Sequence, residues 1–220
     1  MLSTDRRKVS SILTAILAMW FLLVLAAGYA GAFESGPSRP PLAVLLAVVG
    51  PLLIFAAAYR ASRRVHDFVL AIDLRLLTAV QSWRAIGVMF LVFYAFGLLP
   101  GLFAWPAGAG DLAVGLAAPF ILLSMLRQSP TWRRQVLWLN VAGLLDFVSA
   151  IGTGVLTSNN AIGLAADGAA RVSLGSLPLS LIPTFAVPLW TIFHIVSLLQ
   201  LARTAGTVST REAALATPSI

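Results

Sequence analysis

The stretch NVAGLLDFVSAIGTGVL, residues 140–156, contains one charged residue, Asp146, in a sequence that is otherwise almost entirely apolar or small. An apolar run of this kind is typical of a helix that crosses a lipid bilayer, which needs about 20 such residues. A carboxylate at the centre of such a helix costs about 2.5–3.5 kcal/mol to insert. The surrounding apolar residues offset this cost, so the stretch predicts a membrane helix with one polar point.

The composition of the whole chain agrees with this prediction. Of its 220 residues, 59% are hydrophobic and only 10% are charged, whereas soluble domains carry about 25% charged residues. A soluble fold could not bury this much apolar surface, but in a bilayer the lipid itself is the solvent. The chain has no cysteine, which excludes a disulfide framework and a thiolate metal site.

Further apolar runs predict the number of membrane helices. The uncharged run at 9–33 is 25 residues long, and the run at 172–202 is 31 residues long. Such runs give an all-α bundle of six predicted transmembrane helices, at residues 9–32, 41–60, 85–105, 109–126, 135–157 and 178–202. The first could instead be a cleaved secretory signal, but its apolar core exceeds the roughly 7–15 residues that are usual in signals.

The Lys and Arg residues predict the orientation, because they stay on the cytoplasmic side of membrane proteins. With both termini inside, 13 of the 15 basic residues, Arg84 among them, are cytoplasmic, and only Arg39 and Arg171 lie outside. The basic residues form short clusters between apolar runs. We therefore expect no nucleic-acid binding despite the net charge of +7, since that needs a continuous basic patch.

Two segments outside the predicted helices differ in character from the rest. In residues 65–82 the apolar side chains share one side of a helical wheel, which describes either a helix on the cytoplasmic membrane surface or an extension of a neighbouring helix. The end of the chain, 205–220, is small and polar, which is typical of a flexible segment. We therefore predict one transmembrane domain, residues 1–204, and a short flexible cytoplasmic tail.

The neighbours of Asp146 predict the direction of its side chain. At helical spacing it shares a face with small and hydroxyl residues, whereas the opposite face is bulky and includes Phe147. Small residues mark helix–helix contacts in membranes, and bulky residues face lipid. We therefore expect Asp146 to point into the bundle and Phe147 to face lipid.

The last predicted helix offers partners for this carboxylate, because its polar residues form a stripe near the helical period. At 1.5 Å per residue, His194 lies about 12 Å and Asp146 about 16 Å from the inner ends of their helices. These depths are close enough for the two side chains to meet. The candidate polar centre is therefore Asp146, His194, Thr191 and Thr184.

Two further candidates lie nearer the ends of the predicted helices. Asp111 falls in the first turn of the helix at 109–126, where it either caps the helix or lines an outer vestibule. Arg84, with Gln81 before it, falls at the inner end of the third helix, where arginine commonly serves as an interfacial anchor. The expected depth of Asp111 argues against a metal site shared with Asp146 and His194.

The sequence holds no HExxH, P-loop or GxSxG signature, so we assign no catalytic residue, metal ligand or cofactor. The blocks LPGLFAWPAGAGDLAVGLAAP, LLDFVSAIGTGVLTS and LPLSLIPTFAVPLWTIFH resemble recurring segments of uncharacterised small bacterial membrane proteins. The resemblance covers roughly residues 81–201. It implies a bacterial inner-membrane protein and carries no particular activity with it.

Three functions remain open. The leading hypothesis is movement of a small solute, an ion or a proton, with Asp146 as a protonatable site and His194 as its partner. The second is a membrane-embedded redox or metal-dependent enzyme acting on a lipid-soluble substrate, although the lack of a catalytic domain favours a non-enzyme. The third is a structural or accessory subunit, in which the faces of small residues serve assembly with a second copy or another membrane protein.

Overall fold

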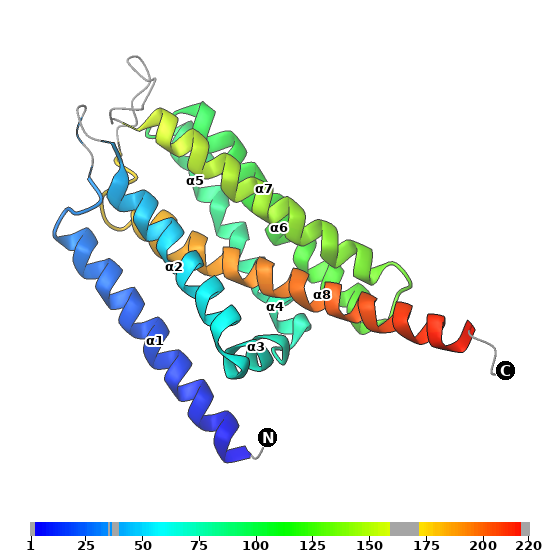
Figure 1. Cartoon of the computed structure of the whole chain (residues 1–220). Coiled ribbons are helices and arrows are strands. Elements are labelled where there is room, and N and C mark those ends of the chain that lie inside the picture. The colour runs from blue at the N-terminus through cyan, green and yellow to red at the C-terminus, as the bar shows by residue number, and fades with distance from the viewer. Residues whose placement is uncertain (1–2, 35, 37–39, 159–171, 217–220) are drawn as a thin grey trace.

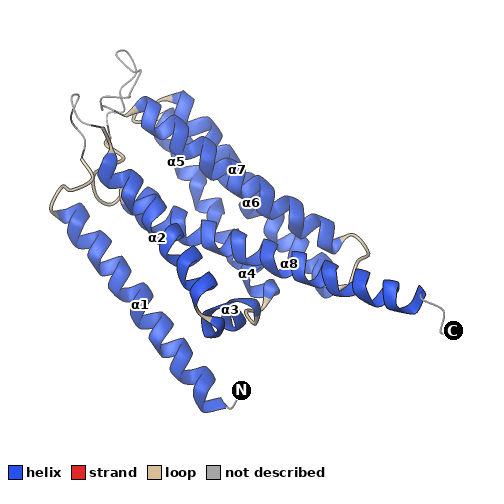
Figure 2. Ribbon diagram, in the orientation of Figure 1, coloured by secondary structure: helices blue, strands red, loops and turns tan. Residues whose placement is uncertain are grey.

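The computed structural model describes residues 3–34, 36, 40–158 and 172–216, and all regular elements within these ranges are helices (Figure 2). The described part of the chain has six segments long and apolar enough to cross a membrane. They are Ser11–Tyr29, Leu42–Ala61, Leu74–Ala95, Gly101–Leu126, Trp132–Thr157 and Ile182–Arg203. The prediction of an all-α, multi-pass membrane protein with six spans is confirmed.

Two of these spans combine more than one helical element. The elements are α1 (Ser3–Tyr29), α2 (Leu42–Ala61), α3 (Arg63–Leu70), α4 (Leu74–Val80), η1 (Gln81–Gly87), α5 (Val88–Ala95), α6 (Gly101–Leu126), α7 (Trp132–Thr157), η2 (Ile182–Ala186) and α8 (Val187–Ala216). The third span is α4, η1 and α5 in series, and η1 is a 3-10 helix. The sixth begins with η2, a turn of π-helix. Figure 1 shows α1 standing at the edge of the bundle, where it packs chiefly against η2.

The third span differs most from its prediction. We expected it at 85–105, but it runs from Leu74 to Ala95 and ends at a turn in which Gly97 has a φ of +66°. The polar residues at 78–84 indicated a cytoplasmic segment, whereas most of them are buried inside the bundle. The fourth span consequently begins at Gly101 and not at 109.

The segment 65–82 divides between the two alternatives. A short amphipathic helix, α3, lies between the second and third spans but covers only 63–70, whereas residues 74–82 extend the third span. The backbone at Ser62 is extended, and its side-chain oxygen accepts a bond from Val65 N, which separates α3 from α2. Gln200 of α8 donates to the carbonyl oxygens of Val69 and Ile72 at 3.1 and 2.9 Å. These bonds fasten the end of α3 to the last span.

The two ends of the bundle differ in charge. Basic residues gather where α2 and α6 end and where α4 and α7 begin, and we call this the basic end: Arg60, Arg63, Arg64, Arg75, Arg127, Arg133 and Arg134. The opposite end, which holds the turn at Gly97, is called the cavity end. Arg84 lies between them and does not belong with the cytoplasmic residues. Arg39 and Arg171 lie outside the described residues.

The last helix is longer than expected. We predicted its end at 202, but α8 continues to Ala216. Most of the segment for which we expected a flexible tail is therefore helical, and residues 217–220 lie outside the described part. Figure 1 shows α8 leaving the bundle in this last stretch.

Candidate functional site

The 3-10 segment η1 places Arg84 in the interior of the bundle. A 3-10 helix has three residues per turn, so side chains three positions apart lie above one another. Gln81, Arg84 and Gly87 have this spacing, and all three are buried. The segment packs mainly against α6. One line of residues therefore faces the neighbouring helices along the whole of η1.

The Arg84 guanidinium binds one carboxylate on each of two helices. Its Nε donates to Asp111 Oδ1 of α6 at 2.7 Å, and its Nη2 donates to Asp146 Oδ2 of α7. The Arg84 side chain is 3% exposed, against 16% for Asp111 and 8% for Asp146. Three charges from three spans thus form one buried cluster. Arginine suits this role, because its rigid fork can bond in several directions at once.

His194 completes the cluster from α8. Arg84 Nη1 lies 3.0 Å from His194 Nε2, and this nitrogen must accept because arginine can only donate. Nδ1 then carries the proton and donates to Asn140 Oδ1 at 2.8 Å. Asn140 in turn donates from Nδ2 to the Val136 carbonyl oxygen at 2.7 Å, which fixes the orientation of its amide. These hydrogen bonds together define a neutral His194 with its proton on Nδ1.

Two glycines of α6 and α7 make room for the charged side chains. A Cβ at Gly143 would overlap the His194 ring and lie 2.6 Å from Arg84 Nη1. A Cβ at Gly110 would overlap the Asp146 carboxylate. The ring of Phe147 covers the cluster from one side, with Arg84 Cζ 4.0 Å from its centroid. This distance is typical of a cation–π contact.

The structure changes the roles that we expected for the charged residues. Asp146 and His194 do not bond each other, and each instead bonds Arg84. Asp111 is not a helix cap, because α6 begins at Gly101 and places it well inside the membrane span. Its expected separation from Asp146 and His194 is therefore wrong. Arg84 is likewise no interfacial anchor, since it lies at the centre of the cluster.

The remaining candidates do not join the cluster. Thr184 and Thr191 donate to the carbonyl oxygens four residues before them, those of Ser180 and Val187, at 2.6 and 2.8 Å. Gln81 is fully buried, and neither polar atom of its side chain has a hydrogen-bond partner among the described residues.

Nothing in the sequence pointed to Asn140, and the helical pattern placed Phe147 on the lipid side, although Phe147 is buried. The interior position of Arg84, by contrast, has a signal in the sequence. Arg84 is the only charged residue in 76–96, and this pattern of one charge in an apolar run is the one that singled out Asp146. For Asn140 we find no comparable signal, because a lone amide in a membrane helix has many uses.

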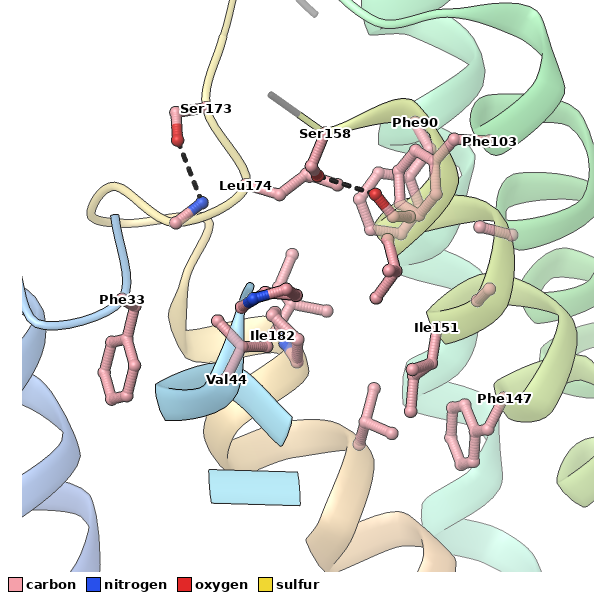
Figure 3. A pocket seen from close by; sticks show the side chains of 18 of the residues that line it. Phe33, Val44, Phe90, Phe103, Phe147, Ile151, Ser158, Ser173, Leu174 and Ile182 are labelled. Carbon is pink, nitrogen blue, oxygen red and sulfur yellow. Dashed lines mark hydrogen bonds between the residues drawn. The ribbon is translucent and has the colours of Figure 1, made fainter. Parts of the chain in front are cut away.

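A cavity of about 150 Å³ lies between the cluster and the cavity end of the bundle. Its walls are mainly apolar and come from α2, α5, α6, α7 and the segment that leads into η2 (Figure 3). Among the described residues that line it, Asp111 is the only ionisable one. The lining nearest the cavity end includes Ser158, Ser173 and Gly175. The cavity thus connects that end of the protein to the edge of the charge cluster.

The cluster has no arrangement typical of a metal site. Among the described residues, no group of three His, Cys, Asp or Glu side chains lies close enough together to hold a metal ion. Asp111, Asp146 and His194 come together only around the Arg84 guanidinium. The position that a metal ion would need to touch all three side chains is occupied by this guanidinium.

These features define the class of the molecule: a multi-pass integral membrane protein with a charge cluster buried between its spans. Residues 41–202 match the family described as "Domain of unknown function (DUF8737)", and the chain belongs to this family. The match includes every residue of the cluster, whereas α1 lies before it. No curated protein and no solved structure matches the chain. The expected resemblance to a family without an assigned activity is confirmed.

Proposed function

We propose that the protein moves a small cation, the proton included, across the membrane, and that Asp111 and Asp146 bind it. The observation that carries this proposal is the charge balance of the cluster. Two carboxylates face one guanidinium, and the hydrogen bonds of His194 leave its ring neutral. With both carboxylates ionised, one negative charge is in excess. An uncompensated charge away from water is costly, so the cluster favours the uptake of one cation.

Both carboxylates keep an oxygen available for this cation. Arg84 occupies Asp111 Oδ1 and Asp146 Oδ2, and the other oxygen of each accepts no hydrogen bond within the described ranges. Asp111 lines the cavity and is the more exposed of the two. A cation that enters from the cavity end therefore reaches Asp111 first and Asp146 second.

Gln81 extends the polar path beyond the cluster. It lies one 3-10 turn, about 6 Å, nearer the basic end than Arg84. Leaving a buried amide without partners costs about 1–3 kcal/mol. In native proteins such a group usually has a water molecule or an ion as its partner. In this proposal the Gln81 amide bonds the cation, or the water that carries it, on the way between Arg84 and the basic end.

The test measures proton movement into liposomes that contain the purified protein. A pH-sensitive dye inside the vesicles reports uptake when a potassium gradient and an ionophore impose a membrane potential. We expect wild-type uptake above that of empty vesicles, and its loss in Asp111→Asn and Asp146→Asn. Asp67→Asn is the matched control, because Asp67 is a 77% exposed carboxylate on α3 and its loss should leave uptake unchanged.

Two outcomes contradict the proposal. Uptake by Asp111→Asn at the wild-type rate would show that this carboxylate is not part of the path. Wild-type vesicles that take up neither protons nor sodium, measured the same way with a sodium-sensitive dye, would exclude small inorganic cations as cargo. Folded protein is confirmed for each variant by its elution from a sizing column in detergent.

A further inference from the structure

We infer that the cavity is a binding site for an organic ammonium ion that carries one apolar group about the size of a benzene ring. The inference deepens the proposed function, since it takes Asp111 as the counter-charge and names the class of cation. It concerns binding at the cavity, which can be measured without any movement across the membrane.

The size and walls of the cavity indicate the apolar part of this ligand. Buried cavities of about 150 Å³, the volume found here, accept a molecule of benzene in other proteins. The side chains that Figure 3 labels around the space are largely aliphatic or aromatic, among them Val44, Ile151 and Ile182. An inorganic cation needs oxygen ligands on several sides, whereas the side-chain oxygens of the described walls are confined to Asp111, Ser158 and Ser173. An apolar group fills the space between these walls favourably.

Aromatic rings form a further part of the wall. Phe90 and Phe103 contact each other edge to face, with ring centroids 5.2 Å apart, and Phe33 faces the cavity from the segment after α1. All three are almost fully buried in the protein. The faces of aromatic rings attract cations, so these walls favour an ammonium group as well as the apolar group attached to it.

Asp111 determines the charge of the ligand. Among the described residues it is the single ionisable one of the cavity wall, and its Oδ2 accepts no hydrogen bond from them. An ammonium N–H can donate to this oxygen, which gives a charge-assisted hydrogen bond. An anionic ligand finds no comparable charged donor among the described lining residues, because Arg84 is not one of them.

The test is isothermal titration calorimetry of the full chain in detergent at neutral pH, with three probes of one shape. Benzylammonium is the cation, benzyl alcohol is its neutral analogue and benzoate is the anion. We expect saturable binding of one benzylammonium per chain, binding of benzyl alcohol at least about tenfold weaker, and no binding of benzoate. Asp111→Asn should weaken benzylammonium binding by about tenfold or more, whereas the control Asp67→Asn should bind it like the wild type.

A second variant tests the cavity without changing any charge. Ala150 lines the cavity, and Ala150→Leu fills it with three more carbon atoms. We expect this variant to lose benzylammonium binding while it retains the proton uptake described above. Equal affinity for benzylammonium and benzyl alcohol would overturn the inference, and so would unchanged binding by Ala150→Leu. Proton uptake without benzylammonium binding refutes only the inference, and binding without any cation movement refutes only the proposed function.

Discussion

At the scale of single residues, the cluster depends on properties that only arginine has. Arg84 bonds two carboxylates and one imidazole from three helices and stacks on Phe147. Lysine carries the same charge on one compact group, which cannot reach three partners in a plane. Removing the guanidinium would leave two carboxylates without a partner inside the bundle. Breaking one buried pair typically costs about 3–5 kcal/mol.

The first prediction concerns two glycines of α7 that differ only in surroundings. Gly143→Ala should destabilise the protein by about 1–3 kcal/mol, because its Cβ would overlap the buried His194 ring. Gly152→Ala should be neutral or stabilising by up to about 1 kcal/mol, since nothing lies within 4 Å of a Cβ there. Thermal unfolding of both variants in one detergent is the measurement. Equal effects at the two positions would mean that the ring does not lie against Gly143.

Single residues also show which parts of the site could be predicted from the sequence. A lone charge in an apolar run predicted Asp146 as a buried polar point, and the same reading applied to 76–96 would have found Arg84. The pairing of Arg84 with the two carboxylates and His194 could not be predicted, because a sequence does not reveal which helices are neighbours. Asp146 and His194 have compatible depths, yet each bonds a residue on a third helix that we had assigned to the membrane surface.

At the scale of elements, the tight 3-10 geometry of η1 determines which of its side chains face the interior of the bundle. In an α-helix, side chains three residues apart diverge around the axis, whereas in η1 they stay in line. The sequence predicted the number of spans from the length of the apolar runs, but it misplaced the third by about half its length. The polar residues before Arg84 have a composition typical of a cytoplasmic loop. Only their burial against α6 and α8 shows that they lie within the span.

The second prediction tests how α8 holds α3. Gln200→Ala removes two hydrogen bonds to the carbonyl oxygens of Val69 and Ile72, each worth about 0.5–1.5 kcal/mol. We expect faster amide hydrogen exchange in α3 and unchanged exchange in α6, measured by mass spectrometry. The control is Gln128→Ala, because Gln128 donates to Met125 O in its own turn. Exchange in α3 that rises equally in both variants would contradict the attachment.

At the scale of the whole molecule, the charges at the two ends predict its orientation. The basic end carries seven arginines, and an even number of spans places both termini on one side. The positive-inside rule assigns that side to the cytoplasm. The cavity and Asp111 then face the outside, and Gln81 lies on the cytoplasmic side of Arg84. The sequence alone predicted this orientation, and moving Arg84 into the membrane leaves it unchanged.

The third prediction tests this orientation with fusions. A reporter that is active only in the cytoplasm should be active when fused after Arg203. A reporter that is active only outside should be active when inserted in the segment between α7 and η2. Activity of the outside reporter at the C-terminal fusion would contradict both the orientation and the even number of spans.

The most direct test of the central claim, that two carboxylates share one guanidinium, is a double-mutant cycle on Asp111 and Asp146. Asp111→Asn and Asp146→Asn should each cost less than about 1 kcal/mol, because the remaining carboxylate still pairs with Arg84. The double variant leaves Arg84 unpaired and should cost about 3–5 kcal/mol. The measurement is the free energy of unfolding of the four proteins in one detergent. The account predicts a double-variant loss that exceeds the sum of the single losses by well over the roughly 0.5 kcal/mol expected of independent sites. Strictly additive losses would contradict it.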